Sequence, residues 1–298
     1  MPVVARDPSV NVRSALRAFC NGSRDATTRL TANEFWRASY TPAGPATVRI
    51  SWTNDTITSE AWGTGSTWML QRVAAMCGLD DPGYQFGPDA HPLILSSQRD
   101  HPGLVFGASG TLYHELLPAI LGQRVTTVEA LRQWSQLCLR LGEPAPGPHP
   151  SLRLPPHPDA LVGCPAWWFH PFGIESKRAQ ALRTVARHYD RIEQWSSLHP
   201  LEAGAKLSLL PGLGTWTIAV AGSPAFGNSD AVPVGDYHLK NMVSWAFTGR
   251  PRGTDAQMVA LLQPYAGQRG RVLRLLLLAG AHAPKFGPKQ RIQPMHRR

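Results

Sequence analysis

The stretch Leu210-Pro211-Gly212-Leu213-Gly214-Thr215-Trp216-Thr217 decides the fold that this sequence indicates. It predicts a tight turn at 211–214, because its two glycines can take positive φ and let another backbone approach closely. Apolar, helix-like stretches precede the turn (201–210) and follow it (215–221). A second helix that begins with free amides and glycines is a good phosphate site. A single carboxylate, Asp236, follows just before another helical run. A phosphate-binding turn combined with an isolated carboxylate indicates chemistry on a nucleic acid.

The composition is that of a folded protein rather than a disordered one. The chain has 298 residues, of which 43% are hydrophobic and 17% are charged, and it contains ten tryptophans. It is therefore long enough for two domains and has enough apolar residues for a core. The N-terminal residues lack the apolar segment of a signal peptide, and the longest apolar run, 275–281, is too short to cross a bilayer. We expect a cytoplasmic protein that makes no membrane contact and associates with the nucleoid when it is on DNA.

Cysteine spacing gives no metal site. The four cysteines are far apart and form no C-x-x-C pair, so they predict free thiols and argue against zinc or iron–sulfur sites. They are Cys20, Cys77, Cys138 and Cys164.

The positive charge of the chain is concentrated at its end. Residues 237–298 hold eleven Lys/Arg and a single acidic residue, Asp255. Their net charge of +10 equals the formal net charge of the whole chain. This asymmetry favours a polyanionic partner such as DNA or RNA. The alternative is a basic tail that only improves solubility.

The chain divides into a mixed N-terminal part and a helical remainder. Strands are predicted at 35–40 and 47–52, joined by a turn at 42–44, and a helix is predicted at 66–77 with Ser66 as its N-cap. A helix is expected at 112–121. Thr126 and Glu129 fit a capping box that opens the next helix, which continues to residue 141. Further helices are expected from about 158, at 175–192, at 237–247 and at 268–280.

In order and spacing, three segments resemble the helix-hairpin-helix (HhH-GPD) DNA glycosylase superfamily, most closely its bacterial 3-methyladenine DNA glycosylase II branch. Pro-Gly-x-Gly alone, or an Asp before a helix alone, would be an ordinary turn or N-cap. The segments are Ala119-Ile120-Leu121-Gly122-Gln123-Arg124-Val125-Thr126, Leu210 to Thr217 as quoted above, and Val232-Pro233-Val234-Gly235-Asp236-Tyr237. The resemblance implies an α+β fold with a small N-terminal α+β domain (1–105), an all-helical catalytic domain (106–283) and a basic irregular tail (284–298).

The resemblance also implies a mechanism. Asp236 would assist hydrolysis of an N-glycosidic bond through a transition state of oxocarbenium character, after the nucleotide is flipped out of the duplex. Trp216 stands where strand-cleaving relatives carry a Schiff-base lysine, so a monofunctional enzyme without lyase activity is expected. Trp216 and Tyr237 would contribute to the base pocket. The alternative for Trp216 is ordinary helix packing.

The remaining site residues are implied by the same resemblance. The DNA-binding residues would be Gln123, Arg124, Pro211, Gly212, Leu213, Gly214 and Thr217. Arg124 stands at the position of the wedge that fills the gap left by the flipped base, and a phosphate or surface contact is its alternative role. No organic cofactor is implied. A structural Na⁺ or K⁺ at the backbone carbonyls of Leu210 and Leu213 is a hypothesis.

The sequence fixes the predicted reaction better than the substrate. The expected partner is double-stranded DNA that contains a damaged, alkylated base, and the protein is expected to act as a monomer. Val220 and the run 275–278 replace aromatic pocket residues of the alkylpurine enzymes, which weakens that assignment. The aromatic cluster 167–172 is expected to pack a helix junction. A noncatalytic lesion-binding protein, or a glycosylase for another modified base or bulky adduct, remains open.

Overall fold

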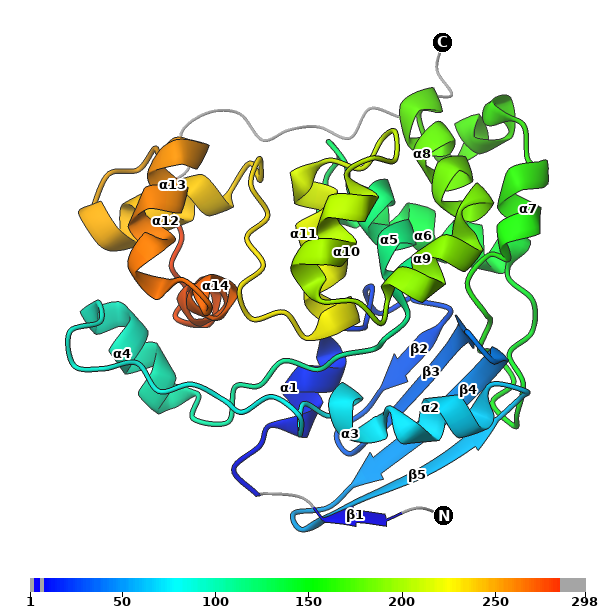
Figure 1. Ribbon diagram of the computed structural model, residues 1–298, viewed down its shortest axis with the longest axis horizontal. Helices are drawn as coiled ribbons and strands as arrows, with labels where there is room; N and C mark the ends of the chain where they lie inside the picture. Colours follow the sequence, from blue (N-terminus) through cyan, green and yellow to red (C-terminus); the bar gives the residue numbers. More distant parts are fainter. Residues whose placement is uncertain (1–2, 6–7, 285–298) are drawn as a thin grey trace.

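The protein has an α+β fold, in which an N-terminal antiparallel sheet lies beneath two groups of helices (Figure 1). The computed structural model describes residues 3–5 and 8–284. The strands run in the order β1-β5-β4-β3-β2, and every neighbouring pair is antiparallel. The strands are β1 (Val3–Ala5), β2 (Thr28–Leu30), β3 (Glu34–Thr41), β4 (Gly44–Trp52) and β5 (Thr56–Trp62).

The predicted hairpin is confirmed as β3 and β4, with Thr41 paired to Gly44 across the turn. One face of these strands packs against short helices through a cluster that includes Phe35, Val48 and Ile50. Those helices are α1 (Val12–Arg17), α2 (Ser66–Gln71) and α3 (Val73–Met76). β5 was not predicted, because its residues alternate only weakly between polar and apolar.

The single helix predicted at 66–77 is wrong in two details. The chain breaks at Arg72 into α2 and α3, and the N-cap is Gly65 rather than Ser66. Ser66 is already helical, because its amide donates to the Gly63 carbonyl at 3.1 Å and the first turn of the helix closes on the Gly65 carbonyl, which accepts from the Met69 amide at 3.0 Å.

The first group of helices surrounds α5, whose predicted bounds are confirmed. Its core contains Leu116, Leu117 and Ile120 of α5, with Trp134 and Phe169 from neighbouring elements. The group comprises α5 (Leu112–Leu121), α6 (Thr127–Leu141), α7 (Pro158–Gly163), η1 (Ala166–Phe172), α8 (Ser176–Arg187), α9 (Tyr189–Trp195), α10 (Pro200–Leu207) and α11 (Thr215–Phe226).

Two helix-end predictions in this group have different outcomes. The Thr126 hydroxyl accepts a hydrogen bond from the Glu129 amide at 3.3 Å, so the predicted N-cap of α6 is confirmed. The single helix predicted at 175–192 is wrong, since the chain breaks at His188 between α8 and α9. There the His188 Nδ1 lies 2.9 Å from the Thr184 carbonyl, where it competes for an acceptor of the helix backbone.

The second group of helices has its own core. It contains α4 (Pro92–Asp100), α12 (Leu239–Thr248), α13 (Asp255–Leu262), η2 (Gln263–Tyr265) and α14 (Arg269–Leu278). α4 lies on the N-terminal side of the boundary expected at 105, yet it packs against α14, and Ser97 Oγ donates to the Leu275 carbonyl at 2.8 Å. In Figure 1 this group lies beside α11, and the segment after α11 crosses between them.

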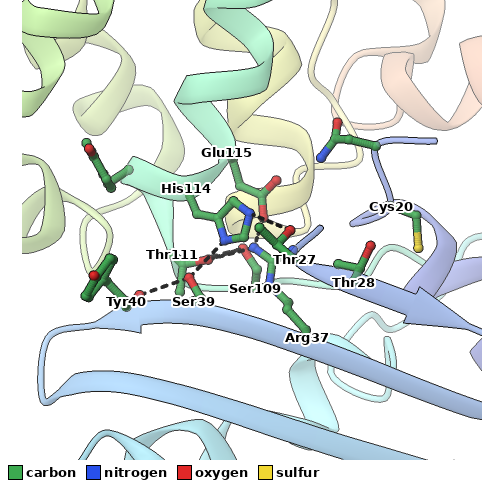
Figure 2. Close-up of polar contacts among 12 residues, drawn as sticks. Cys20, Thr27, Thr28, Arg37, Ser39, Tyr40, Ser109, Thr111, His114 and Glu115 are labelled. Carbon is green, nitrogen blue, oxygen red and sulfur yellow. Dashed lines mark hydrogen bonds and ion pairs between the residues drawn. The ribbon is translucent and has the colours of Figure 1, made fainter. Parts of the chain in front are cut away.

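A buried polar network fastens the sheet to α5 (Figure 2). Arg37 of β3 is fully buried and donates to Glu115 Oε1 at 2.6 Å and to Thr111 Oγ1 at 3.0 Å. His114 Nδ1 lies 2.9 Å from Ser39 Oγ, and burial holds the pKa of His114 well below its usual range. A neutral imidazole and a buried ion pair therefore connect the sheet to the helix that leads into the predicted site.

Three other expectations concern the chain as a whole. All four cysteines are free thiols, and two of them, Cys77 and Cys138, are buried. Within residues 3–5 and 8–284, no helix has the length and apolar character needed to cross a bilayer, and no three His, Cys, Asp or Glu side chains gather as a metal site. The tail expected at 284–298 lies outside the described residues from 285 onward.

Candidate functional site

The central turn joins α10 to α11, as the quoted stretch predicts. Leu210 and Leu213 are buried at 8% and 5% exposure and anchor the turn in the helical core. Gly212 has φ of 91°, and a Cβ there would lie 2.7 Å from the Cβ of Ala181. Gly212 is thus required both for its backbone conformation and for the close approach of α8.

Gly214 differs from the prediction, because its φ of −90° is not positive. It is the N-cap of α11, and no atom lies within 4 Å of where its Cβ would be. Within the described residues, the amides of Gly214, Thr215 and Trp216 find no hydrogen-bond acceptor. The start of α11 therefore presents free N–H groups in an open space, which is the arrangement that binds a phosphate.

Gln123 follows α5 and is tied to the turn. Its Nε2 donates to the Gly212 carbonyl at 2.9 Å and to Thr217 Oγ1 at 2.8 Å. The Thr217 side chain is buried and so faces the protein rather than the surface. Gln123 and Thr217, both predicted to bind DNA, thus hold the 122–124 segment against the turn.

Arg124 is exposed and has φ of 58°, the only positive φ of a non-glycine residue in the described chain. This left-handed conformation costs an L-residue about 1–2 kcal/mol. No described residue bonds to its side chain. The structure therefore aims an unpartnered guanidinium away from the helical core at the position predicted for the wedge.

A buried arginine of α8 supports this segment. Arg178 of α8 is 3% exposed, and burial lowers the pKa of its guanidinium. It donates to the carbonyls of Leu121 and Gly173 at 2.8 and 2.9 Å and to Gln133 Oε1 at 2.6 Å. The end of α5, directly before Gln123, is fixed in this way.

Asp236 is held by three donors. Its Oδ1 accepts from the amides of His238 and Leu239 at 2.8 and 3.0 Å, just before α12, whose N-cap is His238. Its Oδ2 accepts from Trp216 Nε1 at 3.0 Å. The turn and the carboxylate, twenty residues apart in sequence, are thus joined by a hydrogen bond. This carboxylate is half-buried and is fixed in orientation.

Trp216 is placed by its neighbour on α5 as well as by Asp236. A Cβ on Gly122 would lie 3.0 Å from the Trp216 ring, so the indole lies on bare backbone. Tyr237, in contrast, is 76% exposed, and its ring contacts His238 with a centroid separation of 4.9 Å. The structure brings Trp216 to the carboxylate and does not bring Tyr237 there.

A cleft of about 240 Å³ opens between α11 and α14, and it is lined by residues on both sides of Asp236 in sequence but not by Asp236 itself. Pro233 and Leu239, on either side of Asp236 in sequence, line it, as does Val220, one helical turn after Trp216. Leu277 closes it from α14. The two positions where the sequence departs from aromatic pocket residues, Val220 and 277, thus lie in this cleft, and its walls there are aliphatic.

The aromatic cluster 167–172 lies elsewhere. Phe169 is fully buried, and Trp168 contacts both Phe169 and Phe172 within the helical core. None of the three lines the cleft. The expectation that this cluster packs a helix junction is confirmed for Trp168, Phe169 and Phe172, whereas Trp167 is 71% exposed.

Sequence reasoning missed one charged residue of the cleft, Arg274. Its signal was available, since Arg274 is the one charge in the run Val272-Leu273-Arg274-Leu275-Leu276-Leu277-Leu278. A lone charge within an apolar helix is expected to be paired, exposed or functional.

Solved structures of DNA glycosylases have the same fold. A 3-methyladenine DNA-glycosylase from Archaeoglobus fulgidus matches with a TM-score of 0.76 at 16% identity, over 94% of this chain and 99% of that one. MBOgg1, in complex with a low-affinity DNA ligand, matches with a TM-score of 0.69 at 14% identity, over 94% and 98% of the two chains. The apo 8-oxoguanine glycosylase/lyase of Clostridium acetobutylicum matches with a TM-score of 0.66 at 11% identity, over 94% and 99%.

The comparisons by sequence find nothing: no protein-family model matches the chain, and no curated protein matches it. At 11–16% identity the solved structures establish the fold. The chain has the α+β fold of the helix-hairpin-helix DNA glycosylases, as the resemblance predicted, and the likeness extends over the N-terminal sheet as well as the helices.

Proposed function

We propose that this protein is a monofunctional DNA glycosylase. It would bind duplex DNA, flip a damaged base into the cleft and hydrolyse the N-glycosidic bond, which leaves an abasic site and initiates base excision repair. The observation that carries the proposal is the hydrogen bond of 3.0 Å between Trp216 and Asp236, because it joins the phosphate-binding turn to an oriented carboxylate beside a cleft. Three solved DNA glycosylases with the same fold support it.

Asp236 is the proposed catalytic residue. As the glycosidic bond breaks, positive charge develops on the sugar, and a carboxylate held nearby stabilises that charge. It can also orient or deprotonate the attacking water. Three donors already fix its two oxygens, so the carboxylate does not have to reorganise during the reaction. The free amides at the start of α11 would hold a DNA phosphate close by.

Two features support hydrolysis without strand cleavage. Trp216 occupies the position at which the resemblance places a Schiff-base lysine in bifunctional enzymes, and its indole nitrogen is a donor without nucleophilic character. Lys240, one helical turn after Asp236, is held in an ion pair with Asp255 at 3.3 Å. A covalent amine intermediate is therefore not part of the proposed reaction.

Arg124 is the proposed wedge. The Gln123 side chain is hydrogen-bonded to Gly212 and Thr217. The exposed Arg124 side chain has no partner among the described residues and can fill the gap left by a flipped base. Pro211 and the free amides from Gly214 onward would contact the DNA backbone, and Leu213 and Thr217 would support them from the protein side. We propose that the protein acts as a monomer on double-stranded DNA.

A monovalent cation is a further proposal for the turn. The Leu213 carbonyl accepts no hydrogen bond from a described residue, and the Leu210 carbonyl accepts one, from the Leu213 amide at 3.2 Å. Both oxygens fit the requirement of Na⁺ or K⁺ for neutral oxygen ligands. Such an ion would neutralise phosphate charge at the turn. Replacing K⁺ by tetramethylammonium at constant ionic strength should then weaken DNA binding.

Two classes of base fit the reaction. An alkylated purine is the substrate class that the resemblance implies, and its positive charge makes it a good leaving group. The second class, an oxidised or deaminated base, is favoured by the charge of the cleft. Val220 and Leu277 provide no aromatic face for a cationic base, Phe106 is the aromatic residue of the lining, and Arg274 adds a positive charge.

Base release from lesion-containing duplexes tests the proposal. Wild type should release a base from at least one duplex and leave an abasic site that is cut only after alkali treatment. Asp236→Asn preserves the shape and the cap of α12 but removes the charge, and should lower the rate about 100-fold or more. Unchanged release by this variant would contradict the role of Asp236. Tight binding without release from any duplex would make the protein a lesion binder, and strand cleavage without alkali would contradict the monofunctional reading.

A further inference from the structure

Arg274 is built into the cleft wall. It lies on the face of α14 that also carries Gly270, Leu273 and Leu277, and all four line the cleft. The preceding arginine of α14, Arg271, does not line this cleft and pairs with Asp81. Helical spacing therefore directs Arg274 to the same space that Val220 and Leu239 border.

Arg274 has no partner for its charge within the described chain, where no carboxylate, carbonyl or hydroxyl accepts from its guanidinium. Burial lowers its pKa, and the charge of Arg17 lowers it further. Three more deeply buried arginines each bond to acceptors of the protein. Arg37 bonds to Glu115, Arg178 bonds to three acceptors, and Arg271 bonds to both oxygens of Asp81.

Arg274 is half-buried, its guanidinium stays protonated, and its donors are left to bind a ligand. Leu273, Leu277 and Val220 cannot accept from it. A ligand with an oxygen acceptor would satisfy the guanidinium, whereas a cationic ligand would bring two positive charges together in the cleft. The arrangement is therefore selective by charge.

We infer that Arg274 determines the specificity of the proposed glycosylase, by donating to an exocyclic carbonyl oxygen of a neutral purine and by disfavouring cationic alkylated purines. This inference rests on the proposed function, since it assumes that the flipped base enters the cleft beside Asp236. Arg274 is a specificity residue in this scheme and takes no part in bond cleavage.

The test compares four lesions in one duplex sequence. Hypoxanthine and 8-oxoguanine are neutral and carry carbonyl oxygens, whereas 7-methylguanine and 3-methyladenine are cationic. Wild type is compared with Arg274→Leu, which removes the charge, and with Arg274→Lys, which keeps it. Arg24→Gln removes one exposed positive charge outside the cleft and is the control for net charge.

Arg274→Leu should lower the ratio of kcat/KM for neutral over cationic bases by about ten- to hundredfold, the size of one hydrogen bond to a charged group. Arg274→Lys should retain part of the ratio, and Arg24→Gln should leave it unchanged. The corresponding ratio of dissociation constants for the same duplexes is measured with each Arg274 substitution combined with Asp236→Asn, so that no base is released during the binding assay. Thermal unfolding of each variant shows whether it is folded.

The outcomes separate this inference from the proposed function. If wild type releases no base, the proposed function fails, and the binding ratio alone decides the role of Arg274. A ratio that Arg274→Leu leaves unchanged, in release or in binding, overturns the inference. So does an equal loss of affinity for all duplexes, undamaged DNA included, with a reduced salt dependence, because Arg274 would then contact a phosphate.

Discussion

Removing the Gln123 side chain should loosen the turn from α5. Gln123 Nε2 makes two hydrogen bonds, to the Gly212 carbonyl at 2.9 Å and to Thr217 Oγ1 at 2.8 Å. Gly212 is exposed, so water can replace the first bond, but Thr217 is 2% exposed and its hydroxyl would lose this partner inside the protein. Each hydrogen bond contributes about 0.5–1.5 kcal/mol, and the unpaired hydroxyl adds a further cost. Gln123→Ala should therefore lower the free energy of unfolding by about 2 kcal/mol.

A double-mutant cycle with Thr217→Val measures the part that belongs to the contact. Val keeps the shape of Thr217 and removes its hydroxyl, so the second substitution should cost less when Gln123 is already absent. We expect a coupling free energy of about 1 kcal/mol in urea unfolding. Gln194→Ala is the control, because Gln194 is exposed on α9 and its side chain makes no hydrogen bond within the described chain.

The functional consequence follows from the geometry. If Gln123 anchors the turn, Gln123→Ala should weaken binding to a duplex with an abasic site, with a loss of binding free energy similar to its loss of unfolding free energy. Base release should persist at saturating protein. Strictly additive free energies in the cycle would refute the anchoring contact. Normal stability with abolished base release would show instead that Gln123 acts directly on DNA.

Three other perturbations test neighbouring parts of the argument. Arg124→Gly should raise the free energy of unfolding by up to about 1 kcal/mol, because glycine accepts φ of 58° without strain. It should also lower base release, because the wedge is lost. Equal stability of Arg124→Gly and Arg124→Ala would contradict the relief of strain. Gly122→Ala should lower base release with little change in unfolding temperature, because its Cβ at 3.0 Å displaces the Trp216 ring from Asp236, and unchanged release would show that the indole position is unimportant. Burial raises the pKa of Glu193 to about 7, so between about pH 4.5 and 7 the folded state keeps a proton that the unfolded state has lost. The free energy of unfolding should therefore fall by up to about 3 kcal/mol as pH rises through that window, and Glu193→Gln should remove this slope in urea titrations at each pH.

The parts of the fold that were predictable are those set by local chemistry. α5 begins and ends where its apolar run and Gly122 place it, and Thr126 caps α6 through its own hydroxyl. The turn at 211–214 follows from its glycines and its buried leucines. The α8–α9 break was not predictable, because it depends on a side chain of average helix propensity, His188, that turns back to the Thr184 carbonyl.

The candidate site was predictable to the extent that its residues lie in local motifs, and the missed residues are those whose role depends on tertiary contacts. Arg178 and Arg274 are both arginines on helices that bury an apolar face. The fold gives Arg178 three acceptors from other segments and gives Arg274 none. Helical periodicity can predict that both residues lie at an interface. Whether a guanidinium is structural or is open to a ligand depends on the acceptors that distant segments of the chain bring to it.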